Sequence, residues 1–94
     1  MTKYEVKPSS RFQKDYKLLQ KRGKDLSLLK AVIAKFSDGI ELPQSNYDHP
    51  LKGNWRGYRE CHIQPDWLLI YKIEEDILVL SLTRTGTHND LDLF

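Results

Sequence analysis

The 94-residue sequence has a single cysteine, Cys61, and therefore cannot form an intramolecular disulfide. It has no apolar run with the length of a signal peptide or a membrane span. It also lacks a glycine-rich phosphate loop and a Gly-x-Ser-x-Gly motif, so neither a nucleotide-binding loop nor a serine nucleophile is indicated. We expect a soluble, cytoplasmic protein of a reducing compartment, with one domain over residues 1–94.

Spacings typical of metal ligands are missing as well, since the chain contains no Cys-x-x-Cys and no His-x-x-x-His. Cys61 and His62 are neighbours on an expected strand, so their side chains should point to opposite faces. A zinc site built from these two residues with His49 and His88 is therefore disfavoured. The sequence predicts no cofactor.

Acidic residues are scarce in the first third of the chain. Residues 1–35 contain ten Lys or Arg and three Asp or Glu, a charge of +7, whereas residues 36–94 carry −5. A basic block of this kind suits a polyanion such as nucleic acid. A lysine-rich helix surface that serves solubility explains the charge equally well, so charge alone does not decide between the two.

The pattern of apolar residues and breakers predicts an α+β fold. The expected elements are a strand at 4–6, helices at about 9–21 and 25–37, and strands at 55–63, 67–73 and 77–83. Short turns between the last three strands imply an antiparallel meander. The helices, joined at Gly23, form a hairpin on one face of this mostly antiparallel sheet, in the order β-α-α-β-β-β. We expect the other face of the sheet to be open.

The turn at Pro65-Asp66 sets the expected register of the first two meander strands. A two-residue loop would pair Ile63 with Leu68 and His62 with Leu69. In that register the helix-covered face holds Cys61, Ile63, Leu68 and Ile70, and the open face holds Glu60, His62 and Tyr71.

The segment Arg84-Thr85-Gly86-Thr87-His88 combines a guanidinium, which fits phosphate, with an imidazole that exchanges protons near neutral pH. Because the strands are antiparallel, this segment should return to the turn that holds Asp66, beside His62. A set of His62, Asp66, Arg84 and His88 can cleave RNA without a metal. A base takes the 2′-hydroxyl proton, an acid protonates the leaving 5′-oxygen, and the arginine stabilises the phosphoryl charge.

Structural explanations compete with each of these functional interpretations. Asp66 is a standard turn residue. Trp67 and Tyr71 are available to stack on a base, but packing explains both. Arg84 alone would suit an ion pair with Asp90 or with the terminal carboxylate. Only the expected convergence of the residues favours a catalytic site.

Four segments closely resemble the YafQ branch of the RelE/ParE toxin superfamily: Leu51-Lys52-Gly53, residues 57–63, residues 65–71 and residues 84–88. The resemblance covers nearly the whole chain. It implies a RelE-like fold and a toxin of a bacterial type II toxin–antitoxin system that cleaves mRNA in the ribosomal A site. It also implies a DinJ/RelB-type antitoxin as partner, operator DNA bound only through the antitoxin complex, and no membrane partner.

The same resemblance implies roles for individual residues. The catalytic set is the loop histidine His49, the strand histidine His62, the turn aspartate Asp66, the phosphate-stabilising Arg84 and the acid/base histidine His88. Lys52, Trp67 and Phe94 are expected to bind substrate, Phe94 as the C-terminal aromatic that orients the cut base. The family often ends His-x-Asp-Leu-Phe. This chain has two more residues there, so Leu91 or Leu93 is the alternative to Phe94.

Two other functions remain open at this stage. A ParE-like toxin inhibits a protein target such as gyrase and would not need the His, Asp and Arg set. A plain RNA-binding module would bind RNA without turnover.

Overall fold

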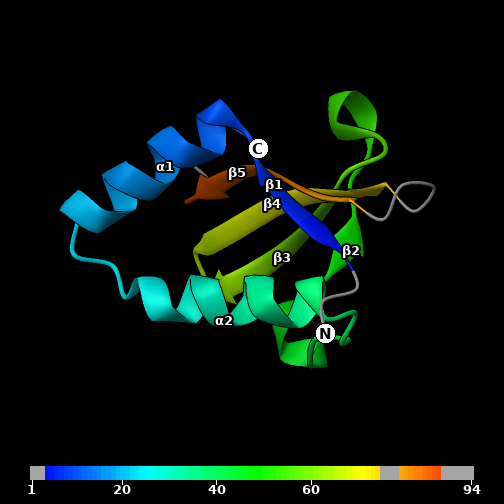
Figure 1. Cartoon of the computed structure of the whole chain (residues 1–94), viewed down its shortest axis with the longest axis horizontal. Helices are drawn as coiled ribbons and strands as arrows, with labels where there is room; N and C mark the ends of the chain where they lie inside the picture. Colours follow the sequence, from blue (N-terminus) through cyan, green and yellow to red (C-terminus); the bar gives the residue numbers. More distant parts are fainter. Residues whose placement is uncertain (1–3, 75–78, 88–94) are drawn as a thin grey trace.

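A five-stranded sheet organises the computed structural model, which describes residues 4–74 and 79–87 (Figure 1). The strands are β1 (Glu5–Pro8), β2 (His49–Pro50), β3 (Arg59–Gln64), β4 (Trp67–Glu74) and β5 (Val79–Gly86), in the sheet order β1-β5-β4-β3-β2. The β1–β5 pair is parallel, and the other pairs in this sheet are antiparallel. The predicted α+β architecture is confirmed.

Two capped helices, α1 (Ser10–Lys21) and α2 (Leu26–Ser37), form the predicted hairpin. The Ser9 hydroxyl accepts the Phe12 amide at 3.0 Å, and the Asp25 carboxylate accepts the Ser27 amide at 3.1 Å, so each helix starts at a side-chain cap. Gly23 has a φ of 76°, a left-handed value that glycine adopts without strain where α1 ends. Neither helix is long and apolar enough to cross a membrane in the described part of the chain.

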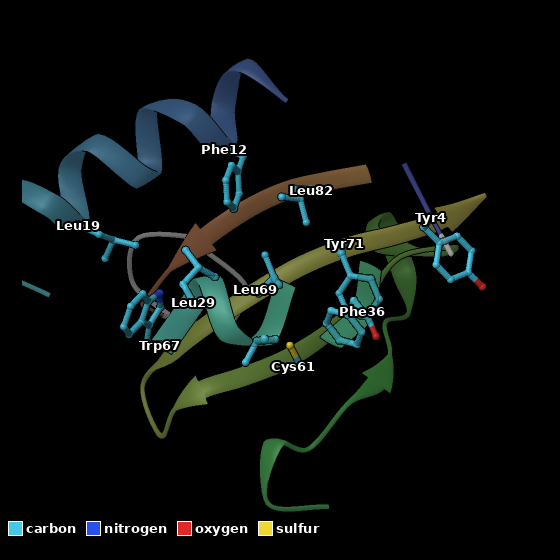
Figure 2. Packing of buried hydrophobic residues seen from close by; sticks show 11 residues of the cluster. Tyr4, Phe12, Leu19, Leu29, Phe36, Cys61, Trp67, Leu69, Tyr71 and Leu82 are labelled. Atoms are coloured by element: carbon cyan, nitrogen blue, oxygen red, sulfur yellow. The ribbon is translucent and has the colours of Figure 1, made fainter. Parts of the chain in front are cut away.

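Both helices bury their apolar sides against the same face of the sheet. Figure 2 shows Phe12, Leu19, Leu29 and Phe36 from the helices gathered over strand residues of β3, β4 and β5. The strand side chains in this cluster are Cys61, Trp67, Leu69, Tyr71 and Leu82. We call the surface that these strand residues form the helix-covered face.

The second face of the sheet is not open along its whole width, contrary to the prediction. Leu68 and Ile70 are fully buried there, beneath Leu51, Trp55 and Tyr58. The covering segment was expected to begin the first meander strand at residue 55. Instead, a short 3₁₀ turn, η2 (Gly53–Trp55), folds it back over the sheet, and β3 begins at Arg59. A second 3₁₀ turn, η1 (Gln44–Asn46), lies in the preceding loop.

The predicted register of β3 and β4 is wrong by one residue. His62 pairs with Leu68 and Cys61 with Leu69, and an irregularity between His62 and Gln64 absorbs the extra residue Ile63. Directly paired residues share a face. Leu68 and Ile70 therefore lie on the second face and Tyr71 on the helix-covered face, the reverse of the prediction, whereas the faces of Cys61, Ile63, Glu60 and His62 are as expected.

The last strand also differs from its predicted range of 77–83. It continues to Gly86, after a register shift between the pairs Ile70–Arg84 and Tyr71–Leu82. Arg84 and Thr85 are therefore held in the ladder of the sheet rather than in the loop that follows it.

Candidate active site on the second face of the sheet

One row of paired residues crosses four strands on the second face. His49 of β2 pairs with Glu60 of β3, Glu60 with Ile70 of β4, and Ile70 with Arg84 of β5. Since neighbouring strands lie about 4.8 Å apart, the two ends of this row are about 14 Å apart. The sheet thus brings histidine, carboxylate and arginine side chains to one surface from distant parts of the sequence. His62 lies in the adjoining row, opposite Leu68.

The carboxylate of Glu60 lies between two imidazoles. Its Oε1 is 3.4 Å from Nε2 of His62 and 3.7 Å from Nε2 of His49, and the two rings are 6.5 Å apart. Glu60 is only 1% exposed, and its Oε2 has no hydrogen-bond partner among the described residues. Burying such a group is costly unless a partner compensates it. In this site, the imidazoles of His49 and His62 are the polar partners that offset the burial of the Glu60 carboxylate.

Backbone carbonyls set the orientation of both histidines. Nδ1 of His49 is 2.6 Å from the carbonyl oxygen of Tyr47, and Nδ1 of His62 is 3.2 Å from that of Pro65. A carbonyl only accepts, so each Nδ1 carries a proton and donates it. Both Nε2 atoms then face the same oxygen of Glu60. A hydrogen bond from either ring to this oxygen needs one more proton, carried by the imidazole or by the carboxylate. The cluster of His49, Glu60 and His62 can therefore hold a proton and pass it on.

The guanidinium of Arg84 is hydrogen-bonded to the carboxylate of Asp15 in α1. Nε and Nη2 of Arg84 each donate to a different carboxylate oxygen of Asp15 at 2.9 Å, and the Thr85 amide adds a bond of 3.2 Å. This two-pronged geometry is the strongest form of a charged hydrogen-bond pair. Asp15 is buried, so it fixes where the cation at this end of the row lies.

Trp67 does not lie where a substrate-binding residue would. It is 1% exposed on the helix-covered face, and its indole N–H donates to the Thr85 hydroxyl at 3.0 Å. That hydroxyl in turn donates to the Leu68 carbonyl at 2.7 Å. The indole N–H thus has its hydrogen-bond partner inside the core. The ring of Trp67 is not exposed, so it is not available for the expected stacking on a base.

Asp66 and Lys52 are the other predicted residues that the structure describes. Asp66 is exposed in the β3–β4 turn, at the same end of the sheet as His62 and the last residue of β5. Lys52 is exposed beside the segment that covers the second face. His88 and Phe94, together with Leu91 and Leu93, lie outside the described residues.

An aromatic residue that was not predicted does lie at the histidines. Tyr47 is 68% exposed, and its ring centroid is 5.7 Å from that of His62 in an edge-on arrangement. It adopts φ 48° and ψ 46°, a left-handed conformation that is uncommon for a residue other than glycine. The Asn46 side chain holds this turn to β3 by donating to the His62 carbonyl at 2.7 Å. The one sequence signal was an aromatic two residues before His49.

Asp48 anchors the loop that carries His49. One of its oxygens accepts both the Tyr71 hydroxyl and, at 3.2 Å, Nε of Arg59. Burial, the hydrogen bond to Asp48 and the charge of that carboxylate raise the pKa of Tyr71, so its phenol stays protonated as the donor. Tyr71 thus has a structural role, and it positions the residue next to His49.

Cys61 offers no nucleophile to the site. It is fully buried on the helix-covered face, and burial, then the charges of Asp48 and Glu60, raise the pKa of its thiol well above the usual range. Within the described ranges, 4–74 and 79–87, no cluster of three or more His, Cys, Asp or Glu side chains is arranged to hold a metal ion.

A comparison with protein families places the protein among the bacterial toxins of type II toxin–antitoxin systems. The model of one family, the YafQ toxins of these systems, matches residues 4–93. The chain belongs to the YafQ family, and the resemblance seen in its sequence is confirmed.

Three relatives illustrate the likeness. The mRNA interferase toxin YafQ of Escherichia coli K12 is 43% identical over 89 residues, which cover 94% of this chain and 95% of the relative. The crystal structure of the E. coli DinJ–YafQ complex matches with a TM-score of 0.86 at 42% identity, over 95% of this chain and 97% of that one. A metal-bound toxin from Helicobacter pylori is 40% identical over the full length of both chains, with a TM-score of 0.87.

Proposed function

We propose that the protein is an mRNA interferase, an endoribonuclease toxin that cleaves mRNA in the ribosomal A site and so stops translation. The E. coli relative carries the name mRNA interferase toxin, which supports this activity. The observation that carries the proposal is the buried carboxylate of Glu60 between His49 and His62, on the face that also presents Arg84. Phosphodiester cleavage without a metal needs proton-transfer groups and a cation, and this face presents both.

The reaction is an attack by the 2′-hydroxyl oxygen on the neighbouring phosphorus. The O2′–P bond forms as a base takes the hydroxyl proton, and the P–O5′ bond breaks as an acid protonates the leaving oxygen. The products are a 2′,3′-cyclic phosphate and a 5′-hydroxyl. The imidazoles of His49 and His62 share the proton transfers through Glu60, and Arg84 stabilises the charge on the phosphoryl oxygens.

Further groups act at the same phosphate and at the base beside it. Asp66 and His88 complete the acid/base set. Lys52 binds the RNA backbone, and Phe94, or Leu91 or Leu93 in its place, orients the cut base. Tyr47 adds an exposed ring next to the histidines, where a base can stack.

Neutralisation by a DinJ/RelB-type antitoxin is part of the proposal. The E. coli relative forms a complex with DinJ, which supports a partner of this type. Operator DNA is reached only through that complex, and the toxin acts in the cytoplasm, where translation takes place. A ParE-like inhibitor of a protein target is not favoured, because it has no use for a carboxylate buried between two imidazoles.

The decisive experiment expresses the wild type and two variants, His62→Gln and His88→Ala, in bacteria and maps the 5′ ends of mRNA during growth arrest. Asp38→Asn, an exposed change at the end of α2, is the matched control. Codon-phased cuts in the wild type and control that vanish in both histidine variants support the proposal. Growth arrest that persists unchanged in the histidine variants would contradict it and favour a protein target.

A further inference from the structure

A cavity of about 350 Å³ begins at Arg84, at the end of the row farthest from His49. It is lined by Ser9, Arg11, Trp55 and Arg84, which come from the start of α1, from η2 and from β5. Its volume is in the range of small-ligand pockets, roughly 300–1,000 Å³. Neither Arg11 nor Trp55 has a part in the cleavage chemistry described above, so this cavity needs its own explanation.

Among the described residues around the cavity, positive charge exceeds negative charge. Arg11 and Asp15 are four residues apart on α1, so both lie on the side of the helix that meets Arg84. The carboxylate of Asp15 offsets the charge of Arg84, to which it is bound through two hydrogen bonds. Arg11 supplies a second cation, and the three groups together carry +1. A ligand with negative charge is therefore favoured in this cavity.

The indole ring of Trp55 forms another wall of the cavity, and the residues packed beneath it fix its position. Trp55 packs against the buried Leu68 and Ile70, and its ring meets that of Tyr58 edge-on at 5.6 Å. Trp55 is half-buried, and it contributes to the lining of the cavity. A fixed indole beside a guanidinium is the usual means by which proteins hold an unpaired base next to its phosphate.

We infer that this cavity, the Arg11–Trp55 subsite, binds a nucleotide of the RNA substrate that neighbours the cleaved linkage. The phosphate of that nucleotide lies against Arg11 at the border with Arg84, and its base stacks on Trp55. Two strand spacings, about 10 Å, separate Glu60 from Arg84, so the same strand of RNA reaches both places. The inference rests on the proposed function, because it assigns a second binding position on the same substrate.

An acidic peptide segment of an antitoxin is the competing occupant. Its carboxylates would use the two arginines, but it would have no need of a flat ring fixed beside them. The continuity of the cavity with the row that ends at Arg84 also favours RNA, since a substrate held at the histidines passes this end of the row.

Tryptophan fluorescence can test the subsite directly. The chain has two tryptophans, and Trp67 is 1% exposed in the core, so a ligand quenches mainly Trp55. The purified toxin is titrated with a short 2′-O-methyl oligoribonucleotide, which cannot be cleaved because it has no free 2′-hydroxyl. Arg11→Gln should weaken the apparent affinity on the order of 10-fold. Lys14→Gln is the matched control, because it removes the same charge from an exposed position of the same helix that does not line the cavity.

A cleavage assay on translating ribosomes supplies the second readout. Trp55→Leu should raise the toxin concentration needed for half-maximal cleavage on the order of 10-fold, whereas Trp55→Phe keeps a ring and should keep most of the affinity. Arg11→Gln keeps the test decisive if Trp55→Leu fails to fold. His62→Gln should retain the quenching while it loses cleavage, so failure of the proposed chemistry is distinguished from failure of the subsite.

Two results would overturn the inference. One is a wild type whose tryptophan emission does not respond to the oligonucleotide, or whose response is weakened equally by Arg11→Gln and Lys14→Gln. The other is quenching by an acidic peptide that the oligonucleotide cannot displace, which would assign the cavity to an antitoxin.

Discussion

The two faces of the central sheet are built on the same strands, but they differ in whether their buried polar groups have hydrogen-bond partners. On the helix-covered face, polar atoms are paired: the Trp67 indole donates to Thr85, and the Tyr71 hydroxyl donates to Asp48. On the second face, Glu60 is equally buried, yet one of its oxygens has no hydrogen-bond partner in the described part of the chain.

This difference indicates that the helix-covered face mainly stabilises the fold, whereas the second face carries the reacting groups. A fully paired apolar layer is what a small domain needs to fold, since burial is its main source of free energy. A buried carboxylate that is only partly compensated costs stability, and proteins keep such groups where they do chemistry. The comparison therefore makes a testable claim: changes on the second face should cost activity, and changes on the helix-covered face should cost folding.

The largest effect is expected for His62→Gln on the second face. The loss of a group that transfers a proton should lower the cleavage rate by about 10²- to 10⁴-fold. The free energy of unfolding should fall by only about 1 kcal/mol, because the Gln amide still offers a donor to the buried Glu60 and the side chain lies outside the apolar core. Single-turnover cleavage on ribosomes and urea unfolding measure the two quantities. A parallel loss of stability and activity would erase the contrast between the faces.

Leu69→Ala tests the helix-covered face in the opposite way. Leu69 is fully buried in the core, so truncation should lower the free energy of unfolding by about 2–5 kcal/mol. The cleavage rate per folded molecule should stay within about two-fold, because no reacting group moves. Urea unfolding at a fixed protein concentration gives the first value. Leu28→Ala, at a leucine that is 37% exposed on α2, is the control and should cost far less.

Glu60→Gln sharpens the comparison within the second face. It keeps the shape of the side chain but removes the charge between His49 and His62. We expect the cleavage rate to fall on the order of 10-fold, less than for His62→Gln, because Glu60 acts through the imidazoles. The pH profile of the rate should also change shape. A rate that is scaled by the same factor at every pH would show that Glu60 only supports the fold.

Local patterns predicted the parts of this fold that depend on neighbours in the sequence. The capped helices, the turn at Gly23 and the antiparallel order of β3, β4 and β5 are as expected, and His62 lies on the predicted face. The short strand β2 falls in residues 40–53, which were expected to be a loop. Apolar spacing and turn residues act over a few positions, so the sequence displays them directly.

The errors arose where one extra residue or a long-range contact decides the outcome. The irregularity at Ile63 carries no glycine or proline to mark it, and it reversed the faces of Leu68 and Tyr71. The pair of Asp15 and Arg84 is separated by 69 positions, so no local pattern could reveal it. Glu60 was placed on the correct face, but its role depends on the β2–β3 register that brings His49 opposite.

The smallest expected effect belongs to Tyr71→Phe, which tests the contact between the helix-covered face and the loop that carries His49. The ring stays in the core against Phe36, while Asp48 loses the hydroxyl donor and keeps Arg59. The free energy of unfolding should fall by about 1 kcal/mol at neutral pH. Cleavage should fall by about two- to three-fold, because Asp48, next to His49, then keeps Arg59 but loses the Tyr71 hydroxyl.

The pH dependence of stability identifies that hydroxyl as the cause. Because the fold raises the pKa of Tyr71, folding keeps the phenol protonated, whereas the unfolded chain releases this proton near its ordinary pKa of 10. The contribution to stability is therefore complete below about pH 10 and declines as the pH rises beyond it. The wild type should lose stability faster than Tyr71→Phe between about pH 9 and 11, measured by urea unfolding. Equal slopes for the two proteins would mean that the hydroxyl does not anchor the loop of His49.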